Sequence, residues 1–267
     1  MQKDSAAKTT KNNGVQSVER AFRILENVCK SQNPISVQDL SEITGIGRTT
    51  VHGLVNTLYN MGYIDRSSIR GHYVISPKLY GMICAYPHRL PVVRAANRRL
   101  IKLSDTFNST VHLCILSPEN EAMLIKAYYP DQVANISESY FFPLHATAVG
   151  KALLAYQPEE RRENLIQQIN TLQYTKNTIH DKDALRAELA AIRQCGYSED
   201  RAEYLDNTYC IAFPIWDDKG QIAAAFSLSD YLENLATREN DIIPIGLQCS
   251  KSCSMEMGWK LGTACTD

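Results

Sequence analysis

Apolar residues recur at helical spacing in three successive segments near the amino terminus. The first set comprises Val18, Ala21, Phe22, Ile24, Leu25 and Val28, and it predicts a core-facing helix. Ser17 is placed to cap the start of this helix. A second helix is predicted from its cap Ser36 to Gly45, and a third from about Gly47 to Asn60.

The second and third of these helices fit a helix-turn-helix. Val37, Leu40 and Ile43 form the apolar stripe of the second helix. Gly45 tolerates the positive φ that the short turn requires, and Ser41 supplies a small side chain where the two helices cross. The spacing therefore predicts two helices joined by a tight turn.

Two short strand patterns follow, at residues 62–65 and 72–76, around a polar turn. Three helices and a hairpin in this order predict a winged helix-turn-helix over residues 14–77, whose third helix enters the DNA major groove. The polar residues at the start of that helix are Arg48, Thr49, Thr50 and His52. We interpret them as contacts to the phosphates and base edges of a double-stranded operator. The alternative is a winged-helix scaffold that contacts only protein.

Strand and helix patterns alternate through the rest of the chain. A helix is predicted from Pro91 to about Phe107. Strand patterns occupy residues 111–116, 121–129, 210–216 and 221–229, and helical patterns occupy residues 146–156, 182–194 and about 237–260. An antiparallel sheet with helices packed on its faces has an α+β fold, which we predict for residues 91–262.

Length and composition agree with two domains. At 267 residues the chain exceeds the usual size of one hydrophobic core, and its 44% hydrophobic and 21% charged residues are typical of globular proteins. Residues 1–13 are polar and aperiodic and are expected to form a flexible tail. Residues 78–90 are expected to form a linker helix that Pro87 terminates.

The net charge of -1 conceals two parts of opposite sign. Residues 1–80 carry 10 Lys and Arg against 6 Asp and Glu, whereas the rest carries 18 against 23. The amino-terminal part is therefore the candidate to bind a polyanion such as DNA. No apolar window has the length of a membrane span, and no secretory signal is evident, so we expect a cytoplasmic protein without a membrane partner.

The eight cysteines are scattered, which is typical of reduced thiols. Two alternative functions would depend on cysteines. A cysteine-dependent enzyme would need Cys210 or Cys114 as nucleophile and His112 or His145 as base, but no local catalytic signature surrounds either thiol. A metal sensor would use His112, Cys114 and His145, of which the first two share a strand face. We predict no enzymatic activity, no metal and no cofactor.

Six segments resemble the IclR family of bacterial regulators, named after the isocitrate-lyase regulator. They are SVERAFRIL (17–25), LSEITGIGRTTVHGLVNTLYNMGYI (40–64), GHYVIS (71–76), PLHATAVGKALLA (143–155), the stretch from GYSEDRAEY to CIAFPIWD (196–217) and FSLS (226–229). The resemblance implies a homodimeric or homotetrameric transcriptional regulator in which the winged helix-turn-helix is joined to a GAF-like effector domain. Gly53, Asn207 and Tyr209 depart from the family pattern. Asn207 stands where Gly is common, and Asn best substitutes for Gly in the left-handed region.

The resemblance also implies an effector pocket. Its positions fall on Phe142, Ala148, Val149, Asp200, Cys210, Ser227 and Ser229. The small residues 148–150 open a helix whose amide groups and dipole attract a carboxylate. Ser227 and Ser229 share one face of a strand. We therefore expect a small organic acid as effector, either a sugar acid or an aromatic acid.

Each of these residues also has a purely structural interpretation. Cys210 also fits a small buried apolar side chain. The serines also fit a solvated strand face. His145 either orients its loop or caps the helix. Lys151 is available for a carboxylate or a Schiff base, but just inside that helix it is expected to be solvated.

Overall fold

The computed structural model describes residues 14–85, 89–130 and 141–260. The chain divides into two compact units, residues 1–86 and 87–267, and each unit has its own hydrophobic core. The tail expected for residues 1–13 lies outside the described residues.

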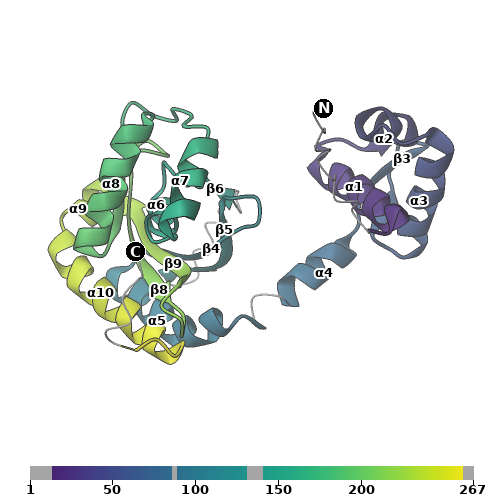
Figure 1. The fold of residues 1–267 in the computed structure, drawn as a ribbon. Coiled ribbons are helices and arrows are strands. Elements are labelled where there is room, and N and C mark those ends of the chain that lie inside the picture. Colours follow the sequence, from purple (N-terminus) through teal and green to yellow (C-terminus); the bar gives the residue numbers. More distant parts are fainter. Residues whose placement is uncertain (1–13, 86–88, 131–140, 261–267) are drawn as a thin grey trace, which may run out of the picture. The chain divides into compact units, whose positions relative to one another are not determined.

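The first unit is a winged helix-turn-helix, as predicted (Figure 1). Its elements are α1 (Gln16–Lys30), β1 (Ile35–Ser36), α2 (Val37–Thr44), α3 (Arg48–Asn60), β2 (Ile64–Arg66), β3 (His72–Ile75) and α4 (Pro77–Ala85). The three strands form an antiparallel sheet in the order β1-β3-β2. The wing therefore gains a third, two-residue strand that the sequence pattern does not indicate.

Local interactions fix the helix-turn-helix. The Asp39 amide donates to Ser36 Oγ at 3.2 Å and the Ser36 amide donates to Asp39 Oδ2 at 3.1 Å, a reciprocal capping box that starts α2. Gly45 ends α2 at a φ of +67°. Ser41 Oγ then donates to the Ile46 carbonyl at 2.7 Å across the turn. These bonds set the angle at which α3 leaves α2.

The core of the first unit excludes part of the predicted stripe of α1. The buried residues are Ile24, Leu25, Val28, Ile35, Leu40, Ile46, Val51, Val55, Leu58, Ile64 and Tyr73. Val18 and Phe22 are instead 51% and 59% exposed, and Ile43 of α2 is also exposed. The prediction was wrong for these three side chains, because no described element of the first unit covers them. Ser17 lies inside α1 and does not cap it.

The second unit is an α+β domain, as predicted. Its elements are α5 (Pro91–Phe107), β4 (Thr110–Leu116), β5 (Ala122–Tyr128), β6 (Phe141–Phe142), α6 (Ala148–Ala155), α7 (Glu159–Gln168), α8 (Lys182–Cys195), β7 (Ser198–Arg201), β8 (Thr208–Trp216), β9 (Ile222–Tyr231), α9 (Leu232–Ala236) and α10 (Glu239–Glu256). The strand order is β6-β5-β4-β9-β8-β7, and all neighbours are antiparallel.

The sheet is covered on both faces, and side chains alternate between two cores (Figure 1). Phe213 of β8 and Phe226 of β9 pack toward α5 and α10. Ala212 and Ala225 pack toward α6, α7 and α8. Because the period is two, Ser227 faces the α6 side together with Ala225.

Several elements of the second unit were not predicted from the sequence pattern. The helix α7 is mostly polar and buries only two side chains, so it shows little apolar periodicity. The strands β6 and β7 and the helix α9 are short. Asn207 adopts a φ of +59°, which agrees with the left-handed turn expected there. No helix in the described residues combines the length and the apolar character that crossing a bilayer requires.

Candidate DNA-binding surface and ligand cavity

The first candidate site is the exposed face of α3. All four predicted DNA contacts are exposed: Arg48, Thr49, Thr50 and His52. Val51 and Val55 on the opposite face are buried in the core and hold the helix in place. The structure therefore presents the four polar side chains together to solvent.

The amino terminus of α3 offers backbone donors beside these side chains. Its N-cap residue is Gly47, which has no side chain to cap the helix. No acceptor in the described part of the chain is found for the amides of Arg48, Thr49 or Thr50. Free amides at a helix start suit a phosphate group. The wing adds exposed Arg66 and Arg70, which the sequence analysis did not single out.

The second candidate site is a cavity of 540 Å³ in the second unit, at the ends of β4 and β9 and the start of α6. All seven residues that the resemblance suggests lie in its wall: Phe142, Ala148, Val149, Asp200, Cys210, Ser227 and Ser229. His112 and Tyr204 also line it. The sequence considered His112 only as a base or metal ligand and passed over Tyr204, which no motif distinguishes.

The start of α6 is built by close backbone packing. Thr147 is the N-cap, and its Oγ1 accepts the Gly150 amide at 3.1 Å. The amides of Ala148 and Val149 have no acceptor among the described residues. A Cβ at Gly150 would lie 2.5 Å from the Pro143 carbonyl oxygen, so only Gly allows this approach. Two residues with free amides, at the amino terminus of α6, therefore line the cavity.

The serine wall lies on β9 and β4. Ser229 pairs with Cys210 of β8 across the sheet. His112 Nδ1 lies 3.2 Å from Ser229 Oγ. Burial lowers the pKa of His112 to about 4, so its ring is neutral at physiological pH. The serines and His112 therefore offer neutral donors and acceptors, and Asp230, which lines the same cavity, pairs with Arg238.

Asp200 is the one acidic side chain of the pocket suggested by the resemblance, and it is 2% exposed. Its Oδ1 accepts the amides of Glu203 at 2.7 Å and Tyr204 at 3.4 Å. Burial raises the pKa of Asp200 to about 7, partly opposed by the amide hydrogen bond from Glu203. The group therefore changes charge near neutral pH.

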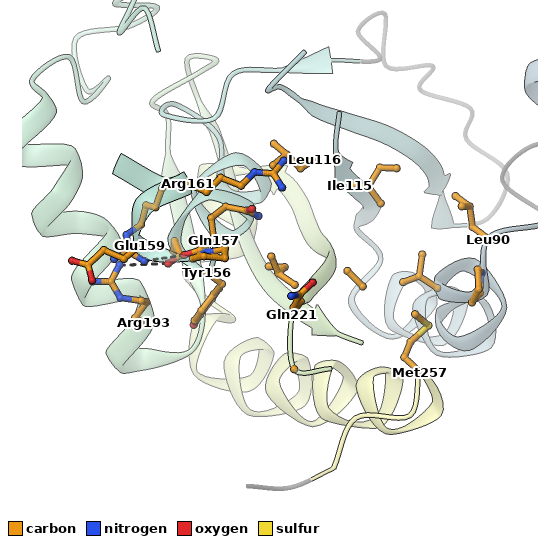
Figure 2. Close-up of a pocket in the computed structure, with 18 residues that line it drawn as sticks. Leu90, Ile115, Leu116, Tyr156, Gln157, Glu159, Arg161, Arg193, Gln221 and Met257 are labelled. Atoms are coloured by element: carbon orange, nitrogen blue, oxygen red, sulfur yellow. Dashed lines mark hydrogen bonds between the residues drawn. The ribbon is translucent and has the colours of Figure 1, made fainter. Parts of the chain in front are cut away.

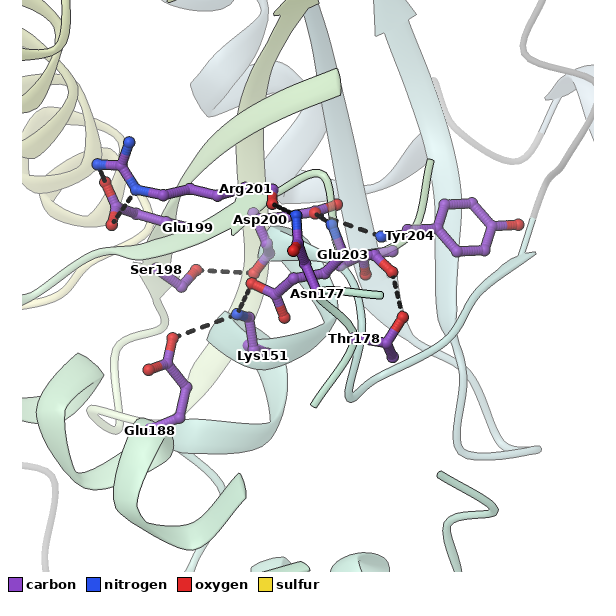
Figure 3. Close-up of polar contacts among 12 residues, drawn as sticks. Lys151, Asn177, Thr178, Glu188, Ser198, Glu199, Asp200, Arg201, Glu203 and Tyr204 are labelled. Carbon is purple, nitrogen blue, oxygen red and sulfur yellow. Dashed lines mark hydrogen bonds and ion pairs between the residues drawn. The ribbon is translucent and has the colours of Figure 1, made fainter. Parts of the chain in front are cut away.

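Behind Asp200 lies a buried charge cluster (Figure 3). Lys151 Nζ donates to Glu203 Oε1 at 2.6 Å and to Glu188 Oε1 at 3.2 Å, and its side chain is 0% exposed. The expectation that Lys151 is solvated was wrong, because the loop after β7 brings Glu203 over the first turn of α6. Ser198 Oγ donates to the Ala148 carbonyl at 2.7 Å and ties β7 to the same turn.

His145 orients the loop before α6. Its Nε2 donates to the Leu172 carbonyl at 2.9 Å. Because Thr147 is the helix cap, the capping alternative for His145 was wrong.

The geometry lends no support to the thiol and metal alternatives. Burial raises the pKa of both Cys114 and Cys210, so neither thiol is activated. Within residues 14–85, 89–130 and 141–260, no three His, Cys, Asp or Glu side chains gather in a metal-binding arrangement.

A winged helix-turn-helix with exposed polar residues on α3 in one unit, and a lined cavity in the other, are typical of a two-domain, ligand-responsive DNA-binding regulator. Comparison with known proteins identifies the family. The family model described as bacterial transcriptional regulator IclR C-terminal matches residues 84–255, and the IclR helix-turn-helix domain matches residues 17–68. The chain belongs to the IclR family of transcriptional regulators.

Characterised relatives are DNA-binding regulators. The regulator XynR of Escherichia coli (strain K12) is 31% identical over 218 residues, which covers 80% of this chain and 86% of XynR. The repressor AllR of the same organism is 32% identical over 221 residues, covering 81% of this chain and 80% of AllR. The chain is therefore a transcriptional regulator and not an enzyme.

Solved structures share the fold. An IclR homolog complexed with 4-hydroxybenzoate from Microbacterium hydrocarbonoxydans has a TM-score of 0.73 at 21% identity, covering 91% of this chain and 99% of that chain. The Thermotoga maritima IclR has a TM-score of 0.66 at 24% identity, with the same coverage.

Proposed function

We propose that a small hydroxylated organic acid, a sugar acid or an aromatic acid, binds in the 540 Å³ cavity and controls operator binding. The observation that carries this proposal is the pairing of two free amides at the start of α6 with a wall of neutral hydroxyl groups. Free amides at a helix start bind an anion, and the serine hydroxyl groups bind hydroxyl groups of a ligand. The volume lies within the usual range for small-molecule sites.

The walls suggest an orientation for the ligand. The carboxylate accepts from the amides of Ala148 and Val149, and Ser227 and Ser229 bond to its oxygens or hydroxyls. Asp200 faces a hydroxyl at the other end, because an ionised Asp200 repels a nearby carboxylate. Phe142 covers the apolar side. The acid 4-hydroxybenzoate, named with the Microbacterium structure, belongs to the same chemical class.

Calorimetry on the full chain with 4-hydroxybenzoate, gluconate and galacturonate tests this placement. Ser229→Val removes a hydrogen-bonding group, and Val149→Phe fills the cavity. Each is expected to weaken binding of whichever of these acids binds the wild type by roughly tenfold or more. Thr106→Val is the matched control, because Thr106 is exposed on α5 and lies outside the cavity. Wild-type affinity in both cavity variants would place the effector elsewhere.

The operator-binding form is proposed to be a homodimer or homotetramer. Val15, just before α1, continues the spacing of Val18 and Phe22 on α1, and all three are exposed. An exposed apolar stripe on a small domain suits a second copy of the same helix. Two winged helices related by a two-fold axis then bind a pseudo-palindromic operator.

A further inference from the structure

The second unit contains another cavity, of 720 Å³, at the opposite end of the same secondary structure (Figure 2). It lies at Ala155 of α6, Leu116 of β4 and Ile222 of β9, whereas the effector cavity lies at the other ends of these elements. No lining residue is common to the two cavities. This cavity is therefore a separate place on the molecule.

Three arginines line one side of this second cavity: Arg161, Arg162 and Arg193. Arg162 Nη1 donates to the Gln157 carbonyl at 3.0 Å, and Arg193 Nη1 donates to the Ala155 carbonyl at 3.4 Å. These bonds hold both guanidinium groups at the carboxyl end of α6. Each guanidinium has five N–H donors, so several donors remain for a ligand.

These arginines lack the acidic partners that several other arginines of the unit have. Arg99, Arg186, Arg201 and Arg238 each form an ion pair with a carboxylate. Over the described ranges, none of the three cavity arginines forms one. Burial lowers the pKa of Arg162, and repulsion from Arg193 lowers it further, partly opposed by the nearby Glu159 and Glu163. A bound anion would relieve this repulsion.

Another part of the cavity wall is apolar. Leu90, Ile115, Leu116, Ile222 and Met257 are partly buried side chains at the edges of the two cores, and they line the same space. Figure 2 shows Arg161 extending over the cavity on the side of Leu116. Glu159 is the one acidic lining residue, so the described lining carries three positive charges against one negative charge.

We propose that this cavity binds a small organic dianion with an apolar body, such as a phosphate monoester. Guanidinium groups match the geometry of phosphate and form short, charge-assisted hydrogen bonds with it. The excess of two positive charges favours a dianion over a monocarboxylate. The apolar wall accommodates the rest of the molecule.

Calorimetry on the full chain with phenyl phosphate, and separately with benzoate, tests the proposal. Phenyl phosphate is expected to bind roughly tenfold more tightly than benzoate, because both have one ring but only the former is a dianion. The variant Arg161→Gln, and the double variant with Arg193→Gln, are expected to weaken phenyl phosphate binding by about tenfold or more. Arg94→Gln is the matched control, since Arg94 is exposed on α5 outside the cavity.

Val149→Phe, which fills the effector cavity, separates the two sites. Phenyl phosphate binding that disappears in this variant would assign the ligand to the effector cavity and overturn the proposal. Equal affinity for benzoate, no heat at millimolar phenyl phosphate, or wild-type affinity in Arg161→Gln would also overturn it. Because Arg161 makes no hydrogen bond or ion pair within the described residues, its single variant tests the site even if the double variant folds poorly.

Discussion

Lys151 is a fully buried cation whose charge is balanced inside the protein. Its ammonium group lies between Glu203 and Glu188, and Glu203 itself is largely buried. Removing one partner of such a pair leaves an uncompensated buried charge, which is more damaging than removing both. The cluster also ties the loop after β7, which carries Glu203, to the first turn of α6.

Lys151→Met is expected to lower the free energy of unfolding by about 3 to 5 kcal/mol, because Glu203 then remains buried without its cation. The double variant Lys151→Met with Glu203→Leu is expected to recover most of this loss. Urea denaturation of the full chain measures both. Lys102→Met on the exposed side of α5 is the control, and a loss in Lys151→Met no larger than in this control would contradict the argument.

Asp200 makes effector binding depend on pH. Its pKa of about 7 means that the carboxyl is mostly protonated at pH 6 and ionised at pH 8. Affinity for a carboxylate effector is therefore expected to rise by up to about tenfold from pH 8 to pH 6, because the repulsion between Asp200 and the carboxylate at the other end of the ligand disappears, while protonated Asp200 can still hydrogen-bond to the ligand hydroxyl. His112 stays neutral over this range, since its pKa is about 4. Titrations at both pH values should show the rise in the wild type and a flat profile in Asp200→Asn; the same rise in both would assign it to another group.

At the scale of elements, α3 combines side-chain and backbone donors at one end. Its first residue Arg48 is exposed beside free amides, and His52 follows one turn later on the exposed face. The Asn56 side chain lies 3.2 Å from His52 Nδ1, so the imidazole is already oriented.

Replacing Arg48 and His52 with Ala is expected to abolish most operator affinity. If Arg48 contacts phosphate, the log-log salt dependence of binding should fall by about 1, and if it contacts guanine, about 1 to 3 kcal/mol of discrimination should disappear. Fluorescence anisotropy at several salt concentrations distinguishes these outcomes. Lys30→Ala, at the far end of α1, controls for net charge, and unchanged affinity in the double variant would exclude α3 as the docking helix.

The helix α1 carries an apolar side that the first unit leaves uncovered. Val18 and Phe22 lie one turn apart and are both more than half exposed. Placing Lys at Phe22 is expected to disrupt a contact between two copies of α1 while the core, anchored by Ile24, stays intact.

At the scale of the whole molecule, the two half-sites of the proposed pseudo-palindromic operator match a protein with two-fold symmetry. Light scattering at micromolar concentration is expected to give a dimer or tetramer for the wild type and a smaller species for Phe22→Lys, with operator affinity reduced in the variant. Phe141→Lys, which changes an exposed aromatic residue in the other unit, is the matched control. A monomeric wild type, with and without operator DNA, would refute the proposed symmetry.

The sequence predicts features that depend on neighbours in the chain. Ser36 and Gly45 mark the ends of α2 because capping and positive φ are local properties. Ser227 and Ser229 fall on one face because the period of a strand is two. The family resemblance further indicates seven residues that the structure brings around one cavity.

Only the tertiary structure decides what distant segments do to each other. Lys151 is buried because Glu188 and Glu203, far along the chain, close over it. The raised pKa of Asp200 depends on burial, which no local pattern encodes. Val18 has the spacing of a core residue but lacks a covering element, and the three cavity arginines converge only through the packing of α6, α7 and α8. Periodicity states which residues share a face, whereas the packing of elements decides which faces are covered and which charges meet.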